Sequence, residues 1–314
     1  MNQPKNSSAV ESGTASINTA LKWPVEINQN LTDSFSAWHD QGANLVMDFH
    51  GSPINPDLVL FSDGNHHMAL MEAVQLFERE QSCSIFYLTL PPALLLKFAQ
   101  AKGLCLGNLC LPIEPNVFIG PDIYLDKLST RYELLPKEKF ASSAGCSVVT
   151  RKSESLFEAG SSLDIRSLMA SGKRMFISHP KNETASYDVY RQTFINMGIA
   201  EGIAESEIMS WLASDLVVLG QDVHHREVPS ALVKGQADFS LVYHHLALRY
   251  ERIFPELEYH NLYSSGTVDV SSLHICTDYF VSTLRDCHGL PKTFYEYMQS
   301  AVVAAIYVEH GLLI

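Results

Sequence analysis

The sequence predicts an α/β protein of two lobes, and three observations support this prediction. A chain of 314 residues is too long for one comfortable hydrophobic core and suits two domains of ordinary size. From about residue 56, short apolar runs alternate with helical patterns, which is typical of parallel sheets flanked by helices. The alternation then starts afresh at Cys146, as expected where a chain enters a second lobe.

The first half of the pattern follows a weakly patterned lead-in, residues 1–55. After the first predicted strand comes the turn Ser62-Asp63-Gly64-Asn65, and then a helix with Leu70, Val74 and Phe77 on one face. The other elements predicted here are strands over 58–61, 84–88 and 116–119 and a helix over 93–102.

The second half repeats the rhythm of strand followed by helix. Tyr187, Tyr190, Phe194 and Met197 lie at helical spacing and predict one helix, and residues 222–229 open another. No low-complexity linker separates the halves, so strands rather than a flexible tether are expected to join the lobes. The remaining predicted elements are strands over 146–150, 174–177, 239–243 and 257–263 and a final helix over 293–307.

Charge and hydropathy limit the classes of partner. The net charge of −13 argues against nucleic acid, which needs concentrated Lys and Arg, although backbone N–H groups and one Arg can still bind a small anion. The apolar run 301–308 is far too short to span a membrane, so no membrane insertion is expected. Residues 1–19 lack a basic start followed by an apolar stretch, which indicates a cytoplasmic protein as written, or a periplasmic one if this end is mis-assigned or processed.

The six cysteines show no paired motif. Cys105 and Cys110 lie five residues apart, which is the wrong spacing for a zinc knuckle or a C-x-x-C redox site. Reduced and mostly buried thiols are therefore expected.

Five segments resemble, in this order, extracellular solute-binding proteins of the molybdate-binding class, over roughly residues 56–314. The run VHHRE-P is typical of a distinct subgroup. The resemblance implies a type II periplasmic-binding-protein fold, in which two α/β lobes joined by two crossing strands close on a ligand. It would place residues 56–145 and 264–314 in the first lobe and 146–263 in the second. The segments are LVLFSDGNHHMALMEAVQLFERE, FYLTLPP, NVFIGPD, FISHPKNETASYDVYRQTFINMG and DVHHREVPSALVKGQADFSLVYHHLA.

The resemblance also implies a ligand site at the strand ends, where helix N-termini present free N–H groups. Ser62 and Thr89 would donate hydroxyls, although turn and N-cap roles fit them equally well. Arg226 would bind an oxyanion or carboxylate through two parallel hydrogen bonds. The alternative is that His224, His225 and Arg226 form a surface turn that pairs with Glu227. Gly64 is also explained as a turn residue, Tyr243 as a core aromatic and Lys181 as a surface charge. The full predicted set is Ser62, Asp63, Gly64, Asn65, Thr89, Lys181, Asn182, His225, Arg226 and Tyr243.

Histidines near these loops allow a second hypothesis. His66, His67 and His224, with Asp63, would supply imidazole and carboxylate ligands for Zn or Ni. Adjacent histidines seldom face one side of a helix, which disfavours such a metal site. No motif for a nucleophile, a phosphate loop or a dinucleotide is present, so neither catalytic residues nor a cofactor are predicted.

The sequence therefore predicts a non-enzymatic receptor that closes by hinge motion around a small oxyanion or carboxylate. A transporter or a regulatory protein would then recognise the closed form. A metal-binding protein or metal-dependent enzyme that uses the histidines is the alternative. A ligand-sensing module that binds a regulatory protein is a third hypothesis.

Overall fold

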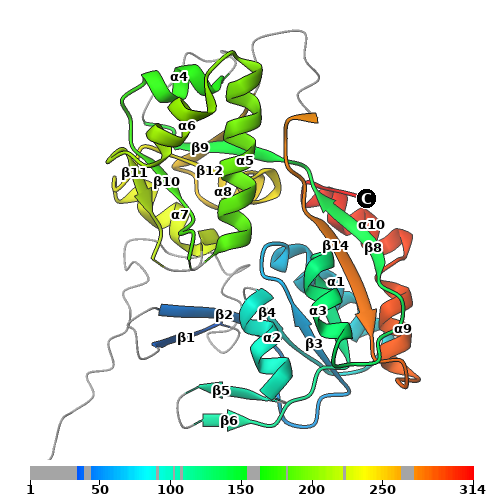
Figure 1. Ribbon diagram of the computed structural model, residues 1–314. Coiled ribbons are helices and arrows are strands. Elements are labelled where there is room, and N and C mark those ends of the chain that lie inside the picture. The colour runs from blue at the N-terminus through cyan, green and yellow to red at the C-terminus, as the bar shows by residue number, and fades with distance from the viewer. Residues whose placement is uncertain are drawn as a thin grey trace, which may run out of the picture.

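The computed structural model describes residues 34–38, 44–89, 92–101, 103–106, 109–153, 163–181, 183–221, 224–262 and 272–314. Its strands form two large mixed sheets, each flanked by helices and each at the centre of one lobe (Figure 1). A separate two-stranded sheet pairs β5 (Leu104–Leu106) with β6 (Leu109–Leu111). The predicted two-lobed α/β class is confirmed.

The first lobe is built on an eight-stranded sheet with the order β1-β2-β4-β3-β7-β14-β8-β15. Its centre is parallel, because β3 pairs in parallel with both β4 and β7. The strand β3 is buried along its whole length, as expected where helices cover both faces of a parallel sheet. The strands are β1 (Ser34–Trp38), β2 (Asn44–His50), β3 (Leu58–Ser62), β4 (Ile85–Thr89), β7 (Val117–Gly120), β8 (Glu138–Ser143), β14 (Asp278–Thr283) and β15 (Leu312–Leu313).

The alternation of side chains along β3 divides the core of this lobe into two layers. Leu58 and Leu60 belong to the layer that contains Phe77 of α1, whereas Val59 and Phe61 belong to the opposite layer. The first layer is covered by α1 (His67–Gln81), α9 (Leu290–Tyr297) and α10 (Ala301–Glu309), and the second by α2 (Pro92–Ala101) and α3 (Asp122–Ser129).

The second lobe is built on a five-stranded sheet with the order β11-β10-β12-β9-β13. The strand β10 is parallel to both of its neighbours, and β9 is antiparallel to β12 and β13. Tyr190, Phe194 and Met197 are buried in its core, which confirms the predicted helix face. The elements are β9 (Cys146–Arg151), α4 (Ile165–Ala170), β10 (Met175–Ile177), α5 (Thr184–Ala200), α6 (Glu205–Leu212), β11 (Val217–Leu219), α7 (His224–Val233), β12 (Phe239–Tyr243), α8 (His244–Ile253) and β13 (Leu257–Asn261).

Two chain segments run side by side between the sheets (Figure 1). Ser143 and Thr277 hold them together, because the Ser143 N–H donates to the Thr277 carbonyl at 2.9 Å and the Thr277 N–H donates to the Ser143 hydroxyl at 2.8 Å. Between β8 and β9, Gly145 has a positive φ of 85°, and a Cβ there would overlap the His274 ring. We keep the lobe limits of 56–145 with 264–314, and 146–263, as a proposal.

The final helical segment differs from the prediction of a single helix over 293–307. The chain forms α9 and α10 instead, with the break at residues 298–300. Ser300 is the N-cap of α10, and its hydroxyl accepts a hydrogen bond from the Val303 N–H at 3.3 Å. A serine side chain stabilises a helix start more than a helix interior, which explains the break.

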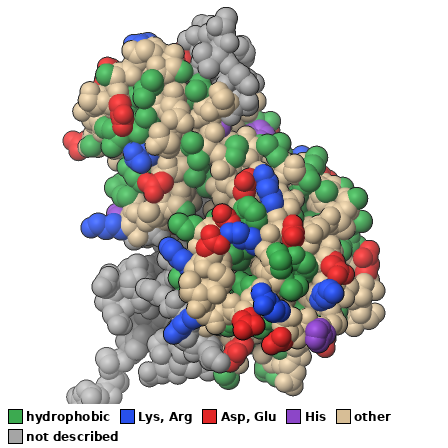
Figure 2. All heavy atoms as spheres, turned by 45° about the vertical axis from the view of Figure 1, so that its right-hand side comes forward, with side chains coloured by type: hydrophobic (Ala, Val, Ile, Leu, Met, Phe, Trp, Pro, Cys, Tyr) green, Lys and Arg blue, Asp and Glu red, His purple; other side chains and the backbone are tan. Residues whose placement is uncertain are grey.

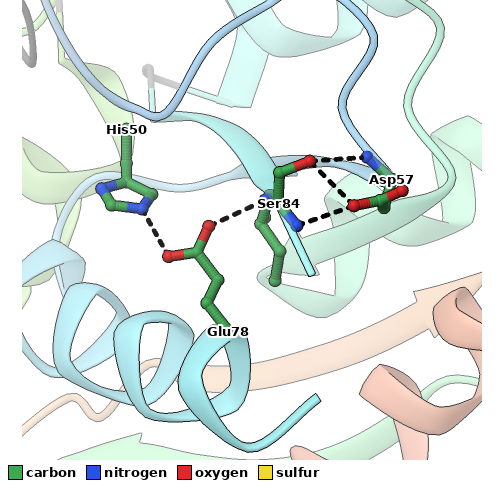
Figure 3. A network of polar contacts seen from close by, with 5 residues as sticks. His50, Asp57, Glu78 and Ser84 are labelled. Atoms are coloured by element: carbon green, nitrogen blue, oxygen red, sulfur yellow. Dashed lines mark hydrogen bonds and ion pairs between the residues drawn. The ribbon is translucent and has the colours of Figure 1, made fainter. Parts of the chain in front are cut away.

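The lead-in also contains structure that its weak pattern did not indicate. The strand β2 pairs antiparallel with β4 and thereby extends the first sheet. Its last residue, His50, lies 2.7 Å from the Glu78 carboxylate of α1, and the other Glu78 oxygen accepts the Ile85 N–H at 2.8 Å (Figure 3). Beside this contact, Asp57 and Ser84 exchange hydrogen bonds at the starts of β3 and β4.

The thiols and the surface complete the description. Cys83, Cys146, Cys276 and Cys287 are free, but only Cys146 is buried, so the expectation of mostly buried thiols is wrong for these four. Among the described residues, no helix is long and apolar enough to cross a bilayer. Acidic and basic side chains are interspersed on the face in Figure 2, and this face lacks the concentrated basic patch that nucleic-acid binding requires.

Candidate functional site

The carboxyl ends of the parallel strands bring the predicted residues of the first lobe together. Ser62 pairs in register with Thr89 of β4 and with Ile119 of β7. In open α/β sheets, ligands bind outside this edge, where loops lead from strands into helices. Ser62 and Thr89 are both buried, so they lie inside the edge rather than on its surface.

The Ser62 hydroxyl has partners within the protein. It donates to the Asp63 carbonyl at 3.0 Å and lies 3.3 Å from His66 Nε2. His66 Nδ1 in turn lies 2.8 Å from the Tyr307 hydroxyl. Both ring nitrogens of His66 are thus in hydrogen bonds, and this histidine links β3, α1 and α10 inside the core.

The turn after β3 is held from both lobes. The Asp63 N–H donates to the Ile119 carbonyl at 3.1 Å, within the first lobe. The Gly64 carbonyl accepts from the His67 N–H at 3.1 Å and lies 3.0 Å from His67 Nδ1. His245 Nε2, from α8 of the second sheet's lobe, lies 3.0 Å from the Asn65 carbonyl.

Tyr243 lies at the carboxyl end of β12 and is buried. Its hydroxyl is 3.1 Å from Thr277 Oγ1, in the segment that precedes β14. Burial raises the pKa of Tyr243 above its ordinary value, so the phenol stays protonated. Whether Tyr243 contacts a ligand stays a prediction.

The other predicted loops of the second lobe are only partly described. Lys181 is exposed, and its N–H donates to His179 Nδ1 at 3.1 Å, so this backbone donor already serves its own loop. Asn182 lies outside the described residues. The backbone of His224, His225 and Arg226 forms the start of α7, as predicted, but their side chains lie outside what the structure describes.

Three buried hydroxyls that the sequence pattern did not indicate lie at these strand ends. Ser178 directly follows β10, Tyr124 lies in the first turn of α3, and Tyr279 is the second residue of β14. Their exposed fractions are 1%, 2% and 0%, yet among the described residues none of the three hydroxyls has a hydrogen-bond partner. Buried polar groups are normally hydrogen-bonded, so each of these three hydroxyls is available to bind a further group, a water molecule or a ligand.

Register and charge place two of these phenols near Asp63. Tyr279 precedes Phe280, which pairs with Gly120 at the end of β7, and Tyr124 follows Gly120 by one turn. Burial raises the pKa of both phenols well above the ordinary value, and the Asp63 carboxylate raises each further. Both therefore remain neutral hydrogen-bond donors at any physiological pH.

Chemically, this arrangement suits binding of an acceptor-rich ligand. Neutral hydroxyls can donate to the oxygen atoms of an anion without the desolvation cost of a buried cation. Among the described residues, no group of three or more His, Cys, Asp or Glu side chains is arranged to hold a metal ion.

Comparison with known proteins assigns the family. The model of the bacterial extracellular solute-binding protein family matches residues 58–313. The chain belongs to this family. No protein with a curated description matches the sequence.

Solved structures share the fold of this chain. Peb3 from Campylobacter jejuni aligns with a TM-score of 0.60 at 14% identity, over 82% of this chain and 100% of Peb3. The periplasmic molybdate-binding protein of Azotobacter vinelandii aligns with a TM-score of 0.59 at 14% identity, over 82% of this chain and 99% of that protein. The sulfate-binding protein SubI of Mycobacterium tuberculosis H37Rv gives 0.57 at 12% identity, over 81% and 85%. These likenesses support the two-lobed fold described above.

Proposed function

We propose that this solute-binding protein recognises a small oxyanion, or a carboxylate that bears one, between its lobes. The observation that carries the proposal is the set of buried hydroxyls of Tyr124, Ser178 and Tyr279, which have no partner among the described residues. Ser178 follows the carboxyl end of β10, Tyr124 follows that of β7, and Tyr279 lies near the amino end of the antiparallel β14. All three thus lie at the edge outside which ligands of open α/β sheets bind.

The ligands of structural relatives support an anion. Solved relatives include proteins described as binding molybdate, sulfate and L-phospholactate. All of these ligands are oxygen-rich anions that accept several hydrogen bonds at once. Hydroxyl and amide donors aligned by strand ends and helix N-termini are suited to such acceptors.

The wider role follows from the family. A solute-binding protein binds and releases its ligand unchanged, so we infer no catalytic step and no cofactor for this chain. Its partner would be a transporter that accepts the solute from the closed form, or a regulatory protein that recognises closure. The family is extracellular by description, which favours a location outside the cytoplasm.

Thermal shift and calorimetry with molybdate, tungstate, sulfate and phosphate test this function. At least one of these anions should raise the melting temperature and bind in calorimetry. Replacing Tyr279→Phe or Tyr124→Phe removes one hydroxyl donor to a charged ligand, which is worth about 1.5–3 kcal/mol, or roughly 10- to 100-fold in Kd. Arg226→Ala, which removes the predicted bidentate cation, should also weaken binding and leave the fold intact.

The control is Tyr297→Phe, because the Tyr297 hydroxyl donates to the Ala73 carbonyl at 3.1 Å, away from the strand ends. This variant loses the same atom and should bind like the wild type. Equal affinity of all three phenylalanine variants, or failure of every anion to bind, would contradict the proposed function.

A further inference from the structure

A single histidine joins the second lobe to the turn at the proposed site. His245 lies in the first turn of α8, and its Nε2 is 3.0 Å from the Asn65 carbonyl of the β3–α1 turn. The side chain is 5% exposed, and its ring stacks on Tyr243 with a centroid separation of 5.4 Å. The two ends of this link, Asn65 and Tyr243, are both residues of the predicted ligand site.

The contact requires a hydrogen on Nε2, which both the neutral Nε2–H tautomer and the charged ring carry, so the cost of protonation arises at the other nitrogen, Nδ1. A carbonyl oxygen can only accept, so His245 Nε2 must carry the hydrogen. His245 Nδ1 is buried and has no hydrogen-bond partner among the described residues. A proton added to Nδ1 would be a buried donor with nothing to receive it, which is costly.

No carboxylate among the described residues forms an ion pair or hydrogen bond with His245. Other histidines instead lie near it: His244 of α8 and His67 of α1 both lower the pKa of His245, and Nδ1 of His67 lies against the Gly64 carbonyl. His310, in the turn after α10, lies 2.9 Å from the Glu72 carboxylate, so that acid is already paired. The ionisable groups near His245 are Asp63 and His66 from the turn before α1, His67 and Glu72 from α1, Tyr243 from β12, His244 from α8, and His310 from the turn after α10.

We propose that His245 is a positioning residue, which holds the Asp63–Asn65 turn in its ligand-binding geometry while neutral and releases it in acid. The inference rests on the proposed function and names a regulation of the same site. Ligand would thus be held at neutral pH and released as the surroundings acidify.

The size of the effect follows from linkage. Burial, which is the main cause, and the nearby histidines lower the pKa of His245 to about 3 in the closed arrangement, from an ordinary 6.5. When the contact opens, the ring regains its ordinary pKa and gains a proton. A drop from pH 7.5 to pH 5 should therefore favour the open form by roughly 30-fold and weaken binding by up to that factor.

The experiment measures sulfate binding by calorimetry from pH 8 to pH 5, because sulfate keeps its charge over this range. The wild type, His245→Gln, His245→Ala and the control His288→Gln, at an exposed position, are compared. The Gln amide N–H can replace Nε2–H toward Asn65 and does not titrate. We expect this variant to bind almost independently of pH, the Ala variant to bind weakly at every pH, and the control to follow the wild type.

A second measurement separates this proposal from the proposed function. Hydrogen exchange of amides in the first turns of α1, such as the Leu70 N–H that donates to the His66 carbonyl, is measured without ligand. Faster exchange in His245→Ala than in His245→Gln supports the positioning role, even if no anion binds. Equal exchange in the two variants overturns it. A His245→Gln variant whose sulfate affinity decreases on acidification as much as that of the wild type also overturns it.

Discussion

Acid should destabilise this fold through His66, which is buried between β3, α1 and α10. Its neutral ring fits its partners in one arrangement: Ser62 donates to the Asp63 carbonyl and accepts from Nε2–H, so Nδ1 accepts from the Tyr307 hydroxyl. The Tyr279 ring also packs on it, with centroids 4.4 Å apart. Protonation of Nδ1 would force the Tyr307 hydroxyl to accept instead of donate, and its own hydrogen would lose this partner inside the core.

The magnitude follows from the pKa of His66, which burial, first, and the neighbouring His245 and His67, next, lower from 6.5 to about 3. A folded-state pKa below the unfolded value means that the unfolded chain binds the proton more readily. The stabilisation is therefore complete above pH 6.5 and is lost progressively as the pH falls toward 3. At pH 5 the loss from this one group is about 2 kcal/mol.

Urea unfolding followed by circular dichroism at pH 7.5 and at pH 5 measures this loss. His66→Gln keeps a donor toward Ser62 but cannot titrate, so it should be less stable at pH 7.5 and lose about 2 kcal/mol less than the wild type on acidification. His288→Gln, at an exposed position, should lose as much as the wild type. His245 is present in all three proteins, so its own contribution cancels. An identical loss in wild type and His66→Gln would refute the reasoning.

Two further predictions concern backbone positions. Gly51→Ala should lower the free energy of unfolding by more than about 1 kcal/mol, because Gly51 has a φ of 77° and a Cβ there would overlap the Ile85 carbonyl. Urea unfolding measures this change. A variant as stable as the wild type would contradict the prediction. Ser300→Ala should lower the free energy of unfolding by about 1 kcal/mol, because it removes the N-cap of α10. Ser300→Asp should retain most of that stability. Equal stability of the Ala and Asp variants in chemical denaturation would contradict the capping role of Ser300.

The buried strands and helices were predictable because their burial is local and periodic. The run at β3 is apolar over its whole length, and Tyr190, Phe194 and Met197 repeat at helical spacing, so each element could be located without tertiary information. The pairing of β2 with β4 was not predictable in this way, because it depends on contacts between residues about 40 positions apart, as in the pair Asp48 and Thr89. The break at Ser300 was not predictable either. A serine there can act as an N-cap or lie inside a continuous helix, and a periodic apolar pattern does not distinguish the two.

The sequence predicted a candidate site at the strand ends but did not indicate the unpaired hydroxyls that lie there. The resemblance placed it at the ends of β3, β4 and β12, where Ser62, Thr89 and Tyr243 lie. The unpaired hydroxyls of Tyr124 and Tyr279 depend on which polar atoms find partners after folding, and no sequence pattern records that. Ser178 was closest to being found, because it directly follows a predicted strand.

The distribution of hydrogen bonds separates positioning from binding at this site. The Ser62 hydroxyl and the carbonyls of Gly64 and Asn65 are engaged within the protein, so their main effect is to fix the β3–α1 turn. The phenols of Tyr124 and Tyr279 are fixed by burial but keep their donors unused among the described residues. A protein with a net charge of −13 gains little from long-range attraction of anions, so affinity must come from such pre-aligned neutral donors at short range. Donors already fixed in place lose little entropy on binding. Under the proposed function, the turn that orders them and the histidine proposed to hold that turn would matter as much as the groups that touch the ligand.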